Sequence, residues 1–151
     1  MKHLLYIIIA ACLGLAACDF ETSDNGDLDG YWQLHQMDTL ATGSSADMRN
    51  SKIMCAVQVR LLEFMTLGEI GTGILFRFEQ RNDSLVLTNP IQDDRNISDS
   101  LVSNPATLVP YGMTPITGKD GKLEVKFCIE KLNDSRMILS NELYRLHFRK
   151  Y

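Results

Sequence analysis

The chain has 151 residues, which suits one compact domain once a targeting segment has been set aside. Acidic side chains outnumber Lys and Arg by 19 to 15, so the formal net charge at pH 7 is −4. The longest basic cluster is Arg149-Lys150, which argues against a nucleic-acid-binding protein. Apolar residues make up 45% of the chain, enough for a hydrophobic core in a single domain.

Residues 1–17 have the pattern of a secretory signal peptide. A positively charged start precedes an apolar run over residues 4–15, which is shorter than the roughly 20 residues that a membrane-spanning helix needs. The run ends in Leu15-Ala16-Ala17-Cys18, which resembles the lipobox of bacterial lipoproteins. The resemblance implies cleavage before Cys18, acylation of its thiol with palmitate or a similar fatty acid, and a membrane anchor. The alternative is an ordinary signal peptide with a chance cysteine.

Residues 18–29 are acidic and polar, and they predict a solvated tether between the lipid and the folded domain. The run also resembles the acidic stretch that marks surface-exported lipoproteins of Bacteroidetes. Two interpretations stay open, a tether alone and a tether that is also an export signal. Both place the protein in a Gram-negative cell envelope, lipid-anchored to the outer membrane, with the surface and the periplasmic face undecided.

The remaining residues, 30–151, predict strand after strand. The expected strands fall at residues 30–37, 53–64, 74–80, 85–88, 123–132, 137–139 and 143–149. Pro90 is expected to end one strand, and residues 89–117 are expected to form a long loop. We therefore expect an all-β antiparallel meander that removes its edges by closing into a barrel. Only six or seven strands are secure, so an incomplete barrel is also compatible with the pattern.

Two cysteines remain after Cys18, and their strand positions place them on opposite faces. Cys55 shares its parity with the apolar Ile53 and Val57, whereas Cys128 shares its parity with charged residues of its strand. Side chains on opposite faces form no disulfide unless a bulge intervenes. We expect two free thiols, although an oxidising envelope would permit a bridge.

No catalytic or metal-binding pattern emerges from the sequence. His35 and His147 lie in predicted strands and are interpreted as residues of a strand face or a barrel rim. The Gly-rich residues 68–73 are not followed by a helix, as a phosphate-binding loop would require. The carboxylates of residues 93–99 are interpreted as solvated rather than as calcium ligands. We predict a non-enzymatic protein without cofactor or metal.

Gly30-Tyr31-Trp32 resembles the Gly-x-Trp sequence that opens the first strand of lipocalins. The whole mature chain also resembles the small lipocalin-like lipoproteins of Bacteroidetes. The resemblance implies that Trp32 closes one end of a barrel over residues 30–151, and that an arginine of the last strand packs across its ring. Arg145 and Arg149 are the candidates for this arginine.

The fold analogy implies a small apolar or amphipathic ligand inside the barrel, under a lid formed by residues 89–117. The aromatic residues that would line such a cavity are Phe64, Phe76, Phe78, Phe127 and Phe148. The alternative is a filled barrel that serves as a structural or protein-interaction module with an envelope protein as its partner. The exposed apolar patch expected in that case is formed by Leu108, Val109, Tyr111 and Met113.

Three short Asp-Ser/Thr-apolar triplets resemble the O-glycosylation acceptor of Bacteroides envelope proteins. Their acceptor residues are Thr39, Ser84 and Ser100. Ser84 lies in a predicted turn and Ser100 in the long loop, where a modifying enzyme could reach them.

Overall fold

The structure is a computed structural model that describes residues 23–69, 71, 73–93 and 100–151. Its strands are β1 (Gly30–Thr39), β2 (Ser44–Asp47), β3 (Ile53–Gln58), β4 (Leu61–Thr66), β5 (Gly73–Arg81), β6 (Ser84–Asp93), β7 (Ser100–Leu101), β8 (Ile116–Thr117), β9 (Leu123–Leu132), β10 (Arg136–Ser140) and β11 (Tyr144–Lys150). Its short 3₁₀ helices are η2 (Gly26–Leu28), η3 (Arg49–Ser51), η4 (Pro105–Thr107) and η5 (Val109–Tyr111). The described residues contain no helix that is long and apolar enough to cross a membrane. The predicted all-β class is confirmed.

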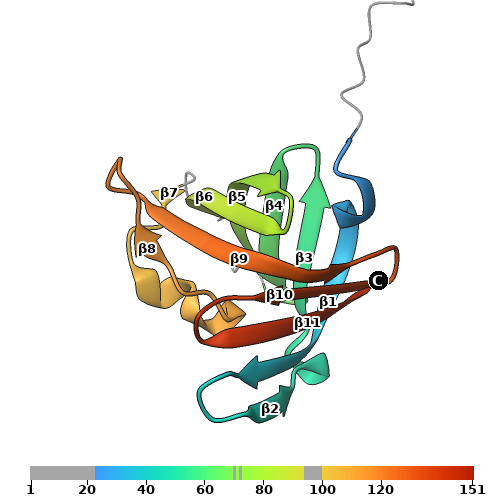
Figure 1. Ribbon diagram of the computed structural model, residues 1–151. Coiled ribbons are helices and arrows are strands. Elements are labelled where there is room, and N and C mark those ends of the chain that lie inside the picture. Colours follow the sequence, from blue (N-terminus) through green and yellow to red (C-terminus); the bar gives the residue numbers. More distant parts are fainter. Residues whose placement is uncertain (1–22, 70, 72, 94–99) are drawn as a thin grey trace, which may run out of the picture.

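Eight of these strands form a closed antiparallel barrel (Figure 1). Their order around the wall is β1-β3-β4-β5-β6-β9-β10-β11, and β11 pairs with β1 to complete the circle. The β1–β11 and β6–β9 pairs close the circle together, because each joins strands that lie far apart in the sequence. The barrel is therefore complete, although the sequence pattern alone left an incomplete one open. The short strands β2, β7 and β8 pair at its rims.

Alternating side chains build the inner face of the barrel. In β9, Leu123, Val125 and Phe127 are buried, whereas Lys126 and Cys128 face solvent. The same alternation around the wall joins the inner residues into one hydrophobic cluster, and no polar or charged side chain of the described residues is buried. Each large apolar side chain that is fully buried contributes roughly 1.5–3 kcal/mol, so this cluster is the main source of stability.

The long strand predicted at residues 53–64 is in fact a hairpin, in which β3 and β4 are joined at Val59 and Arg60. Val59 has a φ of 55°, a conformation that β-branched residues rarely adopt, so the sequence carried no turn signal here. Two hydrogen bonds hold the turn. The Val59 amide donates to Ser23 Oγ, and the Val59 carbonyl accepts from Asn25 Nδ2, both at 2.7 Å.

The prediction that Pro90 ends its strand is wrong, because β6 continues to Asp93. The β5–β6 register shifts between Leu75 and Arg77, which marks a β-bulge in β6, where Asn89 and Pro90 lie opposite Phe76. Asn89 has a φ of 50°, and asparagine tolerates this left-handed conformation better than most residues. The bulge accommodates a residue that has no amide hydrogen to donate to the ladder.

One end of the barrel is closed by the residues that precede β1. η2 places the buried Leu28 beside Trp32, whose Nε1 donates a hydrogen bond to the Leu28 carbonyl at 2.8 Å. Within the predicted 18–29 tether, Leu28 is therefore packed on the barrel, because an apolar residue is better buried than exposed, whereas Asp24 and Asp27 are exposed. Residues 18–22 lie outside the described residues.

The opposite end is closed by the connection between β7 and β8, which carries η4 and η5. Figure 1 shows these two turns at the end of the barrel away from η2. Leu108, Tyr111 and Met113 are buried here, and the Tyr111 ring packs on Phe64 with the centroids 5.8 Å apart. The prediction of an exposed apolar patch on this segment is wrong, since only Val109 of its four members is exposed. The other three complete the core.

Candidate functional site

The aromatic residues that were predicted to line a ligand cavity pack against one another inside the barrel. The Phe64 ring centroid lies 6.4 Å from that of Phe76 and 6.2 Å from that of Phe148, in edge-to-face contacts. Phe127 is buried in the same cluster, and Phe78 is partly buried against it. The described interior is therefore filled by the side chains themselves.

Trp32 is fully buried, but neither Arg145 nor Arg149 packs across it. The cation over its ring is Lys150, whose Nζ lies 4.9 Å from the ring centroid. The buried residues of β11 alternate with the two arginines, so both arginines face outward and Lys150 turns toward Trp32. Gly30 has a φ of 116°, and a Cβ at this position would lie 3.0 Å from Lys150 Cε. Glycine thus provides both the backbone conformation and the space for this lysine.

Cys55 and Cys128 are free thiols on opposite faces of the barrel wall, as strand parity predicted. Cys55 is fully buried, and burial raises the pKa of its thiol. Cys128 is exposed on β9. Cys18 lies outside the described residues, so its lipidation stays a prediction.

His147 connects β11 to the second half of β1. Its Nε2 lies 2.7 Å from Asp38 Oδ2, and Ser45 Oγ and Gln36 Nε2 donate to Asp38 Oδ1 at 2.5 Å and 2.7 Å. These hydrogen bonds, led by that of Ser45, outweigh the effect of burial and hold the pKa of Asp38 at about 2. In the part of the chain that the structure describes, no group of three or more His, Cys, Asp or Glu could hold a metal ion.

The three predicted O-glycosylation acceptors all lie on the surface. Thr39 ends β1 and Ser84 begins β6, both partly exposed, whereas Ser100 is exposed in β7. The Asp38 carboxylate of the first triplet is already engaged by Ser45 and His147. Modification at these three sites stays a prediction.

A groove that the sequence did not reveal lies on the outside of the barrel, beside β2. β1 pairs with β3 through residues 30–33 and with β2 through residues 36–39, so β2 extends from the barrel as an arm (Figure 1). The floor of the groove is the outer face of β10 and β11, and its wall is the arm. Its volume of about 570 Å³ lies within the range of small-molecule sites.

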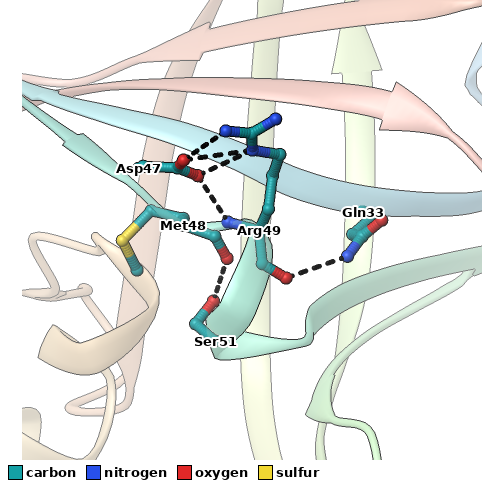
Figure 2. Close-up of polar contacts among 5 residues, drawn as sticks. All are labelled: Gln33, Asp47, Met48, Arg49 and Ser51. Carbon is teal, nitrogen blue, oxygen red and sulfur yellow. Dashed lines mark hydrogen bonds and ion pairs between the residues drawn. The ribbon is translucent and has the colours of Figure 1, made fainter.

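The turn that follows β2 fixes Arg49 at the edge of this groove (Figure 2). Arg49 Nε and the Arg49 amide each donate to Asp47 Oδ1 at 3.0 Å. Gln33 Nε2 donates to the Arg49 carbonyl at 3.3 Å, and Ser51 Oγ donates to the Met48 carbonyl at 2.6 Å. The hydrogen bonds from Arg49 hold the pKa of Asp47 at about 2. The carboxylate therefore stays ionised at neutral pH and continues to accept the hydrogen bonds that fix this turn.

Three further cations, Lys131, Arg136 and Arg149, line the floor of the groove. All three are exposed on the outer face of β9, β10 and β11. Among the described residues, none of the three has a carboxylate within ion-pair distance. With Arg49, the lining thus holds four cations and one carboxylate, Asp47, on a chain whose net charge is −4. The groove is a positive region on an acidic protein.

His35 lies between the arm and the floor, with its Nε2 3.3 Å from Gln33 Oε1. Burial lowers the pKa of His35, the Arg149 and Arg49 cations lower it further, and Asp47 opposes them. The imidazole is therefore predominantly neutral at pH 7.

A second outer groove, of about 980 Å³, lies over β3, β4 and β5 beside the N-terminal residues. Its charged lining is balanced, since Arg60 and Arg77 are matched by Asp29 and Glu63. The two grooves therefore differ in charge, because the one beside β2 has an excess of cations and the larger one is balanced.

Three comparisons place this geometry among known proteins. A family model described as a lipocalin-like domain matches residues 13–151. The chain is similar to a lipocalin-like protein from Bacteroides uniformis, with a TM-score of 0.57 and 22% identity over 83% of this chain and 100% of that one. It is also similar to an uncharacterized protein from Bacteroides eggerthii, with a TM-score of 0.54 and 24% identity over 82% of this chain and 98% of that one. No curated protein matches the sequence.

Proposed function

Since the chain belongs to the family of lipocalin-like domains, we propose that it is a lipid-anchored protein of the bacterial cell envelope that recognises its ligand on the outside of a filled barrel. The barrel serves as a rigid scaffold, and the protein catalyses no reaction. The observation that carries this proposal is the packed interior. A barrel filled by its own side chains leaves recognition to its outer surface.

The interior lacks what a small-molecule site needs. Such a site combines a cavity with a few polar groups that orient the ligand. Among the described residues, the barrel interior buries apolar side chains only, and Phe64, Phe76, Phe127 and Phe148 are each at most 2% exposed. The groove beside β2 offers both open volume and polar side chains. This contrast favours outer recognition over the apolar ligand inside the barrel that the fold analogy implies.

The proposed anchor at Cys18 would hold one particular end of the barrel near the outer membrane. Ser23, which is hydrogen-bonded to the Val59 turn, lies five residue steps after Cys18. A fully extended chain of this length reaches only roughly 17 Å. The end closed by η2 therefore faces the lipid, and Figure 1 shows β2 on the side of the molecule away from η2. The groove and its arm thus remain accessible.

Metabolic labelling in a Gram-negative host tests the anchor. We expect the full chain to incorporate labelled palmitate and to fractionate with membranes. Cys18→Ser should abolish both properties, whereas the matched control Cys12→Ser should retain them because residue 12 is removed with the signal peptide. Label that persists in the Cys18→Ser chain would contradict the anchor.

Titration with apolar probes tests the filled barrel. Residues 23–151 contain every barrel strand and both end segments, so this part has a complete core and is the sample of choice. We expect no saturable binding of palmitic acid or of a fluorescent naphthylamine. Leu87→Ala, which opens space in the buried cluster, should gain binding of xenon and so acts as the positive control for an apolar cavity. One-to-one binding by the unaltered domain would contradict the proposal.

A further inference from the structure

Two arginines stand directly opposite each other on the outer face of the barrel. Arg136 of β10 pairs with Arg149 of β11 in the sheet register, which places their Cβ atoms roughly 5 Å apart. Like charges in this arrangement destabilise a sheet. Neither side chain has a carboxylate partner among the described residues. The pair therefore costs folding free energy that an anion bound between the two guanidinium groups would offset.

The other cations of the groove surround the same space. Arg49 uses Nε and one terminal nitrogen on Asp47, which leaves the N–H groups of its second terminal nitrogen available. Lys131 stands opposite Ile138, which in turn stands opposite His147, so the floor has an apolar centre beside its charged rim. A ligand suited to this lining carries a compact negative group on a small carbon skeleton.

We propose that the groove between β2 and the outer face of β10 and β11 binds a phosphate monoester, with Arg136 and Arg149 clamping its oxygens. The ester belongs to a sugar phosphate or to a lipid whose phosphate is a monoester, such as phosphatidic acid, and these two sources present the same group. This inference rests on the proposed function, because it names the ligand that the outer surface recognises.

The charge and shape of the lining favour a phosphate over other anions. A guanidinium group binds two oxygens of one anion in a forked geometry, and a phosphate monoester has enough terminal oxygens for Arg136, Arg149 and Lys131 together. A single carboxylate offers two oxygens and half the charge. The net charge of −4 on the whole chain repels a long polyanion, so a compact ester fits better than a nucleic acid.

Binding of glycerol phosphate to residues 23–151, followed by NMR, tests the proposal. We expect saturable shifts at the groove, with glycerol as the uncharged control that causes none. Arg136→Gln and Arg149→Gln should each weaken binding about tenfold, the effect of losing one charge-assisted contact. Arg60→Gln, in the exposed β3–β4 turn, is the matched control and should leave the affinity unchanged. Equal losses in all three variants would overturn the proposal.

The pKa of His35, followed through its NMR resonance, gives a second readout. It would not change if Arg136 and Arg149 had only a structural role. Burial lowers the pKa of His35, Arg149 and Arg49 lower it further, Asp47 raises it, and Gln33 Oε1 is its neutral neighbour. A bound phosphate dianion adds negative charge beside these cations and should raise the pKa of His35. An unchanged His35 titration in saturated protein would place the anion elsewhere and overturn the assignment.

Vesicles separate the two sources of the ester. Phosphatidylcholine vesicles with phosphatidic acid should capture the domain more strongly than vesicles without it if the ligand is a headgroup, and Arg149→Gln should abolish the gain. Binding of glycerol phosphate without any such gain assigns a soluble ester. Failure to bind either probe overturns the proposal. The apolar probes test the filled barrel separately. Failure of the phosphate proposal can therefore be distinguished from failure of the proposed function.

Discussion

The barrel interior and the groove beside β2 use their side chains in opposite ways. Inside, Phe64 contacts Phe76, Tyr111 and Phe148, and the described residues bury no charged or polar side chain. In the groove, four cations accompany one carboxylate, which pairs with Arg49, and two arginines stand face to face. The first arrangement lowers the free energy of the folded state, whereas the second raises it. The buried apolar interior thus stabilises the fold, whereas the outer groove keeps cations without a carboxylate partner, which an anionic ligand can bind.

The largest effect is expected from breaking the interior. Phe64→Ala removes a ring that contacts three others, and such truncations cost about 3–5 kcal/mol of the free energy of unfolding. Tyr31→Ala is the control, since this aromatic residue is 58% exposed and should change stability by less than about 0.5 kcal/mol. Chemical denaturation measures both. Similar losses in the two variants would remove the distinction between core and surface.

The end segment formed by η4 and η5 should behave as part of the interior. Gly112 has a φ of 72°, and a Cβ there would lie 2.5 Å from Leu146 Cδ2. Gly112→Ala should cost roughly 2–3 kcal/mol through backbone strain and overpacking together. Gly121 has a φ of 78° but nothing within 4 Å, so Gly121→Ala should cost only about 1 kcal/mol. Equal costs would show that this segment is not packed into the barrel.

A smaller, pH-dependent effect is expected where the arm meets β11. The pKa of Asp38 is about 2 in the folded chain, below its ordinary value of 3.8. The ionised carboxylate therefore stabilises the fold above pH 3.8, and this contribution is lost as the pH falls toward 2. Asp38 is partly exposed, so we expect Asp38→Asn to cost only about 1 kcal/mol at neutral pH.

Denaturation of both proteins across the acid range measures this effect. The difference between them should shrink to nothing at the acid end. A difference that stays constant with pH would mean that the carboxylate charge does not hold the arm.

The smallest effect should have the opposite sign. Arg136→Gln removes one of two facing cations and should raise the free energy of unfolding by roughly 0.3 kcal/mol. Arg81→Gln removes a cation that pairs with Glu79 at 2.6 Å, and should lower it by a similar amount. Replicate thermal melts at low salt compare the two variants. A loss of stability in Arg136→Gln would show that the arginine pair is structural.

Much of the fold was predictable because strand alternation is a local signal. The pattern of β9 predicted its inward residues, and the opposite faces of Cys55 and Cys128 followed from parity alone. The β3–β4 turn was missed because it depends on Val59 in a left-handed conformation that Ser23 and Asn25 hold from far away in the sequence. Hydrogen bonds between residues so far apart in the sequence cannot be predicted from a local sequence pattern.

The site was less predictable because it depends on which strands lie side by side. The cation over Trp32 could have been found, since the inward parity of Phe148 in β11 extends to Lys150 and excludes Arg149. The groove could not, because Arg49 and Arg136 line one space only when β1 pairs with both β2 and β11. Arg149 was expected across Trp32 and Arg136 lies outside the strand predicted at residues 137–139, so their face-to-face register was not predicted.

The most direct test of recognition on the outside of a filled barrel is one NMR titration of residues 23–151 with glycerol phosphate. It should observe the arginine side chains and the interior methyl groups together. The account predicts saturable shifts of Arg136 and Arg149, while the methyl groups of Leu87 and Leu139 do not move. Shifts centred on the interior methyl groups, or none at all, would contradict it.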